Sequence, residues 1–286
     1  MILSVHVRTP GERTTNTSIG RSRTMADLAL AAVSVAGLLA FLFPFLISSI
    51  GATATGGANR AVDSSLLLAI LVGGSLLIAI GELARGDASG GLTRSIALLG
   101  VLVAIDASLR FAPSLAGASP IFALIVLVGY VYGPRFGFVM GALTLLLSAA
   151  ITAGVGPWLP FQMLCAGWVG MVAGWLPHGR RPAAQLAMLA AYGALTGFVF
   201  GALMNLYSWP FAAPGVESDV GLFWTPSLTL GEALHRYAAY YLTTSLTHDA
   251  TRALGTAALL AIAAPATLRL LLRFQTRSSW SESASG

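Results

Sequence analysis

The feature that most constrains this chain is a series of apolar runs, each close to the length that crosses a lipid bilayer. A helix of about 20 apolar residues spans the hydrocarbon core and satisfies its backbone polar groups internally. We therefore predict an all-α, polytopic membrane protein with about eight transmembrane helices. The last run exceeds one crossing, so we expect it to start or end outside the lipid. The runs are residues 27–49, 64–84, 94–112, 118–133, 136–153, 159–177, 183–207 and 238–271.

The composition agrees with a chain that lives in lipid. Only 9% of the residues are charged, whereas a soluble domain carries about 25%. All 16 cationic residues are arginine, and they stand near the ends of the apolar runs. Nucleic-acid binding needs a clustered basic face, so that class is excluded. The single Cys165 lies inside an apolar run, which excludes disulfides and a cysteine-built metal site.

The arginines also predict the orientation of the chain in the membrane. Cytoplasmic loops carry an excess of Lys and Arg, and an even number of spans puts both termini on one side. That side collects most of the arginines, whereas Arg60, Arg110 and Arg236 fall on the other. We therefore expect a multi-pass protein of the cell (plasma) membrane with cytoplasmic termini. Residues 1–24 are expected to form a disordered tail, and residues 274–286 a second cytoplasmic tail.

Two segments on the expected external side carry aromatic residues at a membrane boundary. Residues 154–163 read Gly-Val-Gly-Pro-Trp-Leu-Pro-Phe-Gln-Met, a pattern that shapes either a ligand site or gate, or a plain turn. Residues 208–236 form the longest polar excursion between runs, and loops of that length usually have a function. This segment is either a lid over a binding site or a set of interfacial anchors.

The beginning of the last run adds a third aromatic and polar cluster. Four residues at helical spacing are predicted to share one face: Tyr237, Tyr241, Thr244 and His248. Tyrosine offers a broad ring and a hydroxyl group, which suits a ring-bearing ligand, although an aromatic belt at the membrane surface has the same composition. The candidate substrate-binding residues are Trp158, Phe161, Gln162, Asn205, Tyr207, Trp209, His235, Tyr237, Tyr240, Tyr241 and Ser245.

Two carboxylates lie at membrane depth, where an ionisable group is costly and marks a functional candidate. Asp106 stands four residues before Arg110, and Asp249 three residues before Arg252. Both spacings put the opposite charges on one helix face, so we predict two structural ion pairs. For Asp249 and Arg252, a bridge to a neighbouring helix or a contact with substrate is the alternative, and a proton relay through such groups is a further one.

The third run carries a stripe of small residues. Ala97, Gly100 and Ala104 follow the small-xxx-small pattern that lets a second helix approach closely. The stripe serves either a partner subunit or packing within the chain.

The sequence lacks the common catalytic motifs. It contains no P-loop, no His-Glu-x-x-His and no Gly-x-Ser-x-Gly elbow. We therefore predict a non-catalytic protein that binds no cofactor or metal of its own.

Several segments of the chain match the pattern of one known family. They are Leu109-Arg110 after an Ala/Gly-rich helix, Pro120-Ile-Phe-Ala-Leu, Gly129-Tyr-Val-Tyr-Gly-Pro-Arg-Phe-Gly-Phe138, Gly154-Val-Gly-Pro-Trp-Leu-Pro-Phe-Gln-Met163 and Gly167-Trp-Val-Gly170. Through them, residues 93–273 resemble the substrate-binding membrane subunit, the S component, of energy-coupling factor (ECF) transporters, a type of ABC importer. The run from Gly129 to Met163 is the most specific part.

The resemblance implies a six-helix substrate-binding core at 93–273, with residues 25–92 adding two helices that the family does not explain. It implies capture of a vitamin or related micronutrient from the external side. It also implies docking through Ala97, Gly100 and Ala104 onto a transmembrane coupling subunit driven by two ATPase subunits, so that ATP is used by the partners. The final helix and the external loop look most like the cobalamin-type subgroup.

Three alternatives stay open at this point. Thiamine, riboflavin, biotin or another micronutrient can replace cobalamin or its precursor as the ligand. A self-sufficient secondary transporter would use Asp106 and Asp249 to couple an ion gradient, and it would need no partner subunits. A structural subunit of a membrane assembly would bind no ligand.

Overall fold

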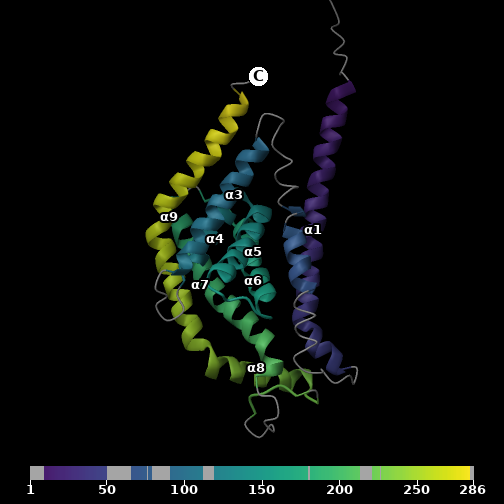
Figure 1. Cartoon of the computed structure of the whole chain (residues 1–286). Helices are drawn as coiled ribbons and strands as arrows, with labels where there is room; N and C mark the ends of the chain where they lie inside the picture. The colour runs from purple at the N-terminus through teal and green to yellow at the C-terminus, as the bar shows by residue number, and fades with distance from the viewer. Residues whose placement is uncertain are drawn as a thin grey trace, which may run out of the picture.

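The computed structural model of the chain describes residues 10–49, 66–75, 77–78, 91–111, 119–179, 181–212, 221–225 and 227–283, all helix or loop (Figure 1). A short apolar helix covers Leu66–Ser75. The other elements are α1 (Pro10–Ser49), α3 (Gly91–Ser108), η1 (Leu109–Phe111), α4 (Ile121–Tyr132), α5 (Pro134–Ile151), α6 (Leu159–Ala173), α7 (Pro182–Ser208), η2 (Trp209–Phe211), α8 (Leu230–Thr244) and α9 (Leu246–Ser283).

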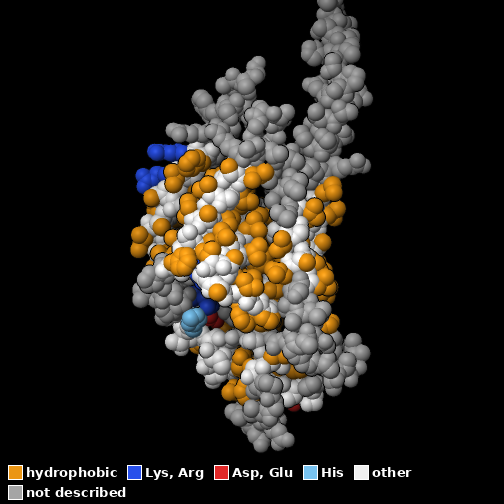
Figure 2. Space-filling model, in the orientation of Figure 1, with side chains coloured by type: hydrophobic (Ala, Val, Ile, Leu, Met, Phe, Trp, Pro, Cys, Tyr) orange, Lys and Arg blue, Asp and Glu red, His pale blue; other side chains and the backbone are white. Residues whose placement is uncertain are grey.

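The helices confirm the all-α, polytopic membrane class. Among the described residues, four helical segments are long and apolar enough to cross a membrane: Thr24–Phe45, Pro134–Ile151, Pro182–Phe211 and Leu246–Gln275. Hydrophobic side chains dominate the described flank of the bundle, and cationic side chains gather near its upper end (Figure 2). The count of eight crossings stays a prediction. Helix α1 begins at Pro10, inside the segment that we expected to be disordered.

The core of the bundle is the contact between α4, α5 and α6, and glycines make it possible. A Cβ atom added to Gly137 would overlap the carbonyl oxygen of Gly170, and one added to Gly170 would overlap the carbonyl oxygen of Gly137. Gly129 meets the same Gly170 carbonyl from α4. Between α4 and α5, Gly133 turns the chain with a φ of 95°, a conformation that glycine adopts without strain. Gly129, Gly137 and Gly170 are therefore packing residues, and Gly133 is a turn residue.

Helix α1, which the family resemblance does not explain, is an integral part of the bundle. Arg135 at the start of α5 donates from Nε and Nη2 to the carboxylate of Asp27 over 2.7 and 2.6 Å. Trp168 Nε1 of α6 donates to Ser34 Oγ over 3.1 Å. Neither contact was predictable from the sequence, because each joins residues more than 100 positions apart.

The predicted helix at 238–271 is wrong in one respect, because two helices share this region. Helix α8 ends at Thr244, and Ser245 leaves the helical conformation with a φ of −129° before α9 begins. The hydroxyls of Thr243 and Thr244 donate to the carbonyls of Ala239 and Tyr240 over 2.8 and 2.6 Å. Such side-chain bonds compete with the backbone hydrogen bonds of the helix and can bend it. The break places His248 on α9, so it does not share a face with Tyr237 and Tyr241.

Candidate functional site

Aromatic rings from six segments meet at one end of the bundle, where α6 begins and α7 ends. Ring centroids are 4.8 Å apart for Phe41 and Phe161, and 4.3 Å apart for Phe161 and Tyr207. One turn along α1, Phe45 lies 6.0 Å from Trp209 and 5.5 Å from Trp224. We call these residues, together with Tyr237, the aromatic cluster: Phe41, Phe45, Phe161, Tyr207, Trp209, Trp224 and Tyr237.

Trp209 lies at the centre of the aromatic cluster. It is only 3% exposed, and its Nε1 donates to the carbonyl of Leu222 over 2.9 Å. Its ring meets Tyr237 of α8 edge to face, with 5.2 Å between centroids. Arg236 of α8 also donates to the carbonyl of Phe223, over 3.3 Å. Residues 221–225 are therefore tied to both η2 and α8. The remainder of the proposed lid, residues 213–220 and 226, lies outside the described residues.

The structure brings most of the predicted binding residues to this end. Phe161, Tyr207, Trp209 and Tyr237 are in ring contact within the cluster, and Tyr240 meets Phe223 at 6.3 Å between centroids.

The other predicted residues lie around the cluster. Asn205 Nδ2 reaches Thr244 Oγ1 over 3.4 Å, which joins α7 to the end of α8. Trp158 is 44% exposed, and its Nε1 donates to the carbonyl of Gly154 within the same loop. His235 is exposed, and Gln162 and Ser245 are half-buried.

The prediction missed the contribution of α1. Phe41 and Phe45 stand four residues apart and so occupy one face of that helix. The spacing is visible in the sequence. However, aromatic residues in a transmembrane run are ordinary lipid or core contacts, so nothing distinguished these two.

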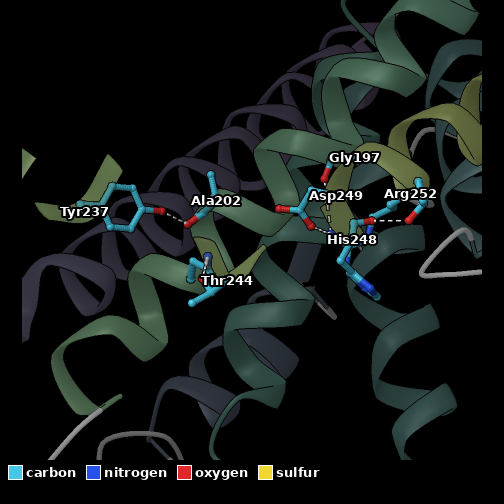
Figure 3. Close-up of polar contacts among 9 residues, drawn as sticks. Gly197, Ala202, Tyr237, Thr244, His248, Asp249 and Arg252 are labelled. Atoms are coloured by element: carbon cyan, nitrogen blue, oxygen red, sulfur yellow. Dashed lines mark hydrogen bonds and ion pairs between the residues drawn. The ribbon is translucent and has the colours of Figure 1, made fainter. Parts of the chain in front are cut away.

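The predicted ion pair of the last run is confirmed. Asp249 Oδ1 accepts from Arg252 Nη1, which also lies 3.4 Å from the carbonyl of Gly197 on α7, as Figure 3 shows. The Arg252 guanidinium lies over the Phe200 ring, 5.4 Å from its centroid. Asp249 is 1% exposed. Together these contacts fasten α9 to α7.

Two tyrosines of α8 approach the same region. Tyr237 Oη donates to the carbonyl of Ala202 over 2.5 Å (Figure 3). Tyr241 Oη and Asp249 Oδ2 are buried, and neither has a hydrogen-bond partner among the residues that the structure describes. Burial, and then the nearby Asp249 charge, raises the pKa of Tyr241 to about 12. Burial is also the main cause that raises the pKa of Tyr237. Both hydroxyls are therefore protonated at neutral pH. The Tyr237 hydroxyl is already used in its bond to Ala202, so only the Tyr241 hydroxyl is left as a donor for a ligand.

The predicted pair of Asp106 with Arg110 is wrong. The α-helical part of this segment ends at Ser108, and Arg110 lies in the 3-10 turn η1, so the i, i+4 geometry is lost. Arg110 is exposed. Asp106 is fully buried, and neither of its carboxylate oxygens has a hydrogen-bond partner in the part of the chain that the structure describes.

The small-residue stripe of α3 is exposed. Ala97, Gly100 and Ala104 all face away from the bundle, and a Cβ atom at Gly100 would meet nothing within 4 Å. The opposite face of α3 is buried, with Leu99 7% and Val103 6% exposed. Within the described residues, the stripe therefore has no packing role inside the chain.

The described residues contain no group of three or more His, Cys, Asp or Glu side chains that could hold a metal ion. What this end of the bundle offers chemically is ring stacking, hydroxyl and amide hydrogen bonds, and one internally compensated ion pair.

The comparisons with known proteins give one match. A family model described as "ECF transporter, substrate-specific component" matches residues 94–264, which run from α3 into α9 and make up more than half of the 286-residue chain. No curated protein and no solved structure matches.

Proposed function

Because this chain belongs to the family of ECF transporter substrate-specific components, and is thus the substrate-binding membrane subunit of an ECF importer, we propose that it captures a vitamin or related micronutrient. Cobalamin or a precursor is the favoured ligand, taken up from the external side of the cell membrane. The family implies association with a coupling subunit and ATPase subunits. ATP is then hydrolysed by those partners, and this chain supplies specificity.

The observation that carries the proposal is the aromatic cluster. Rings contributed by helices far apart in sequence meet at one end of the bundle, beside hydroxyl and amide groups that can orient a ligand. Binding sites for small molecules combine mostly apolar walls with a few polar groups. The described residues of the site include no cluster of arginines, which a highly charged phosphate ligand would need. A ring-bearing ligand of low charge fits this chemistry best.

Thermal unfolding of the detergent-purified chain against a vitamin panel tests the proposal directly. The panel includes cobalamin and its fragments, thiamine, riboflavin and biotin. A ligand that binds only the folded state raises the apparent stability, by about 2.7 kcal/mol at a concentration 100 times its Kd. A shift with one compound identifies the ligand class. No shift with any of them contradicts vitamin capture by the isolated chain.

We expect two aromatic substitutions to weaken ligand binding. Trp158→Ala and Tyr241→Ala each remove one ring from the proposed site, and losing an aromatic contact worth about 1.4 kcal/mol lowers affinity about tenfold. Ligand titration of the purified variants measures the effect. The matched control is Trp175→Ala, which removes a 61% exposed ring after the opposite end of α6. Unchanged affinity in both site variants would contradict the placement of the ligand.

The exposed stripe on α3 is the proposed docking surface for the coupling subunit. Gly100→Leu puts a side chain into open space, so we expect the isolated chain to fold and bind ligand normally. The leucine would keep a partner helix from the close approach that small residues permit, and co-purification with the coupling subunit should be lost. Gly73→Leu is the matched control, because Gly73 is also open within 4 Å but lies outside α3. If both variants retain the partner, the docking assignment is wrong.

One observation favours a second candidate function. Asp106, which is fully buried and has no hydrogen-bond partner among the described residues, is the kind of intramembrane carboxylate that a proton-coupled or ion-coupled secondary transporter uses. Uptake into vesicles that contain this chain alone, driven by an ion gradient and abolished in Asp106→Asn, would support it. Uptake that requires the partner ATPases supports the importer.

A further inference from the structure

Helix α8 has three faces, which separate its residues by chemistry. At 100° per residue, the first face carries Tyr237, Tyr240 and Ala233, which are buried or half-buried against the bundle. The second carries the polar residues Glu232, His235, Arg236 and Thr243. The third, which we call the leucine stripe, consists of Leu230, Leu234, Ala238 and Leu242, all exposed.

The apolar side chains of the leucine stripe are highly exposed. Leu230 is 79%, Leu234 62% and Leu242 58% exposed. They stand at intervals of four and eight residues, so their side chains form one continuous strip along the helix. Transfer of apolar surface out of water is favourable by about 25 cal/mol per Å². A strip of this kind on a 15-residue helix therefore needs an apolar medium beside it.

The polar face carries charged and hydrogen-bonding side chains that favour contact with water. Glu232 closes a capping box with Thr229, whose backbone N–H and hydroxyl donate to Glu232 Oε2 over 2.9 and 2.7 Å. These bonds, with the hydroxyl bond the largest cause, lower the pKa of Glu232, so the carboxylate is ionised at neutral pH. His235 lies beside it on the same face and is exposed. An ionised, exposed face next to a leucine stripe is typical of helices that lie in the membrane surface.

The apolar surface beside the stripe belongs to a membrane-spanning helix. In Figure 1, α8 runs across the lower end of the bundle at a steep angle to α9. After the break at Ser245, the exposed apolar surface continues on α9 through Leu246 (38%), Leu254 (71%) and Ile262 (80%). Helix α9 contains the span Leu246–Gln275, and only 28% of the most apolar 18 residues of this span are buried inside the bundle. Lipid must therefore cover the surface that the leucine stripe extends.

We propose that α8 is an interfacial helix, with its leucine stripe in the lipid of one leaflet and its polar face in water. Its partner is the bilayer itself. The break at Ser245 lets the chain lie in the membrane surface before α9 turns to cross it. The placement does not depend on the identity of the ligand or on the proposed import function.

The placement has a structural consequence for the candidate site. Tyr237 packs against Trp209 from the buried face of α8, and Arg236 bonds to the carbonyl of Phe223. The same helix therefore rests on lipid with one face and supports the aromatic cluster with another. The bilayer thus helps to hold one wall of the site.

Paired single-cysteine labelling tests the proposal. Leu234→Cys and His235→Cys are neighbours on α8 but lie on the leucine stripe and the polar face, and both side chains are exposed. Each variant is labelled with an environment-sensitive fluorophore and reconstituted into vesicles of phosphatidylcholine and phosphatidylglycerol. The wild-type chain is the labelling control, because its one cysteine, Cys165, is 2% exposed. Leu242→Cys and Thr243→Cys repeat the comparison about two turns further along.

We expect the label at position 234 to emit at shorter wavelength than the label at 235. Quenching by spin-labelled lipid should be several-fold stronger at 234, and quenching by aqueous iodide several-fold stronger at 235. Equal iodide quenching at both positions would place the stripe in water and overturn the proposal. Protection of position 234 from both quenchers would mean that protein, such as a second copy of the chain, covers the stripe, and it would also overturn the proposal.

Discussion

Replacing Gly170 with alanine should destabilise the folded chain by about 3 kcal/mol, the upper end of the range for overpacked cores, or more. The added methyl group would overlap the carbonyl oxygen of Gly137, and α5 cannot move away without breaking its own packing on α4 and α6. Alanine is intrinsically favoured over glycine in a helix by about 1 kcal/mol, so the collision has to exceed that gain. Backbone atoms cannot rotate aside as a side chain can, which is why we expect the collision to dominate. Thermal unfolding and size-exclusion chromatography of the detergent-purified variant measure the effect.

The control for this prediction is the same substitution in open space. Gly100→Ala adds a methyl group that meets nothing within 4 Å, so the helix preference alone acts and stability should be unchanged or raised by up to about 1 kcal/mol. If Gly170→Ala melts at the same temperature as Gly100→Ala, the close approach of α5 and α6 is not the contact that holds the core together.

The glycines illustrate how far the sequence could predict this fold. Apolar runs of bilayer length predicted the membrane class, because length and hydropathy are local properties of the chain. The segments around Gly137 and Gly170 were recognisable as a pattern typical of one family. Their physical role was not predictable, because it depends on α5 and α6 lying backbone to backbone, and two glycines 33 positions apart carry no local sign of that contact.

The ends of helices were the least predictable part of the fold. The apolar run that continues through Ser245 gives no signal for a break, because the break accompanies bonds from the hydroxyls of Thr243 and Thr244 to backbone carbonyls. Likewise, the pairing of Asp106 with Arg110 required the α-helix to continue past Ser108, where it tightens into a 3-10 turn. A change of one turn in a helix end removes an i, i+4 pair altogether.

In the candidate site, too, some residues were predictable from local sequence and others depended on tertiary packing. Tyr207, Trp209 and Tyr237 were predictable as candidates because aromatic and polar residues gather at the ends of neighbouring apolar runs. Phe41 and Phe45 were not, because their role depends on where α1 packs. That packing is fixed by long-range contacts such as the Asp27 pair with Arg135, which a single sequence does not reveal.

The second large effect is expected at the Asp249–Arg252 pair. Asp249→Ala removes the carboxylate and leaves the Arg252 guanidinium, whose side chain is only 13% exposed, without its charge partner between α7 and α9. Breaking a buried ion pair from one side typically costs about 3–5 kcal/mol, because the remaining charge is uncompensated. We therefore expect the variant to unfold at much lower temperature in detergent. A change of less than about 1 kcal/mol would mean that Arg252 reaches water or lipid headgroups instead.

The double variant Asp249→Ala/Arg252→Met separates a structural role from a functional one. Removing both charges of a buried pair often restores stability, so the double variant should melt closer to the wild-type chain than Asp249→Ala does, and the four chains form a thermodynamic cycle. Ligand binding by the stable double variant then decides the role of the pair. Retained binding shows that Asp249 and Arg252 only fasten α9 to α7. Lost binding in a chain that is fully folded shows that the pair contacts the ligand, and the floor of the site then extends from the aromatic cluster to the α7–α9 contact.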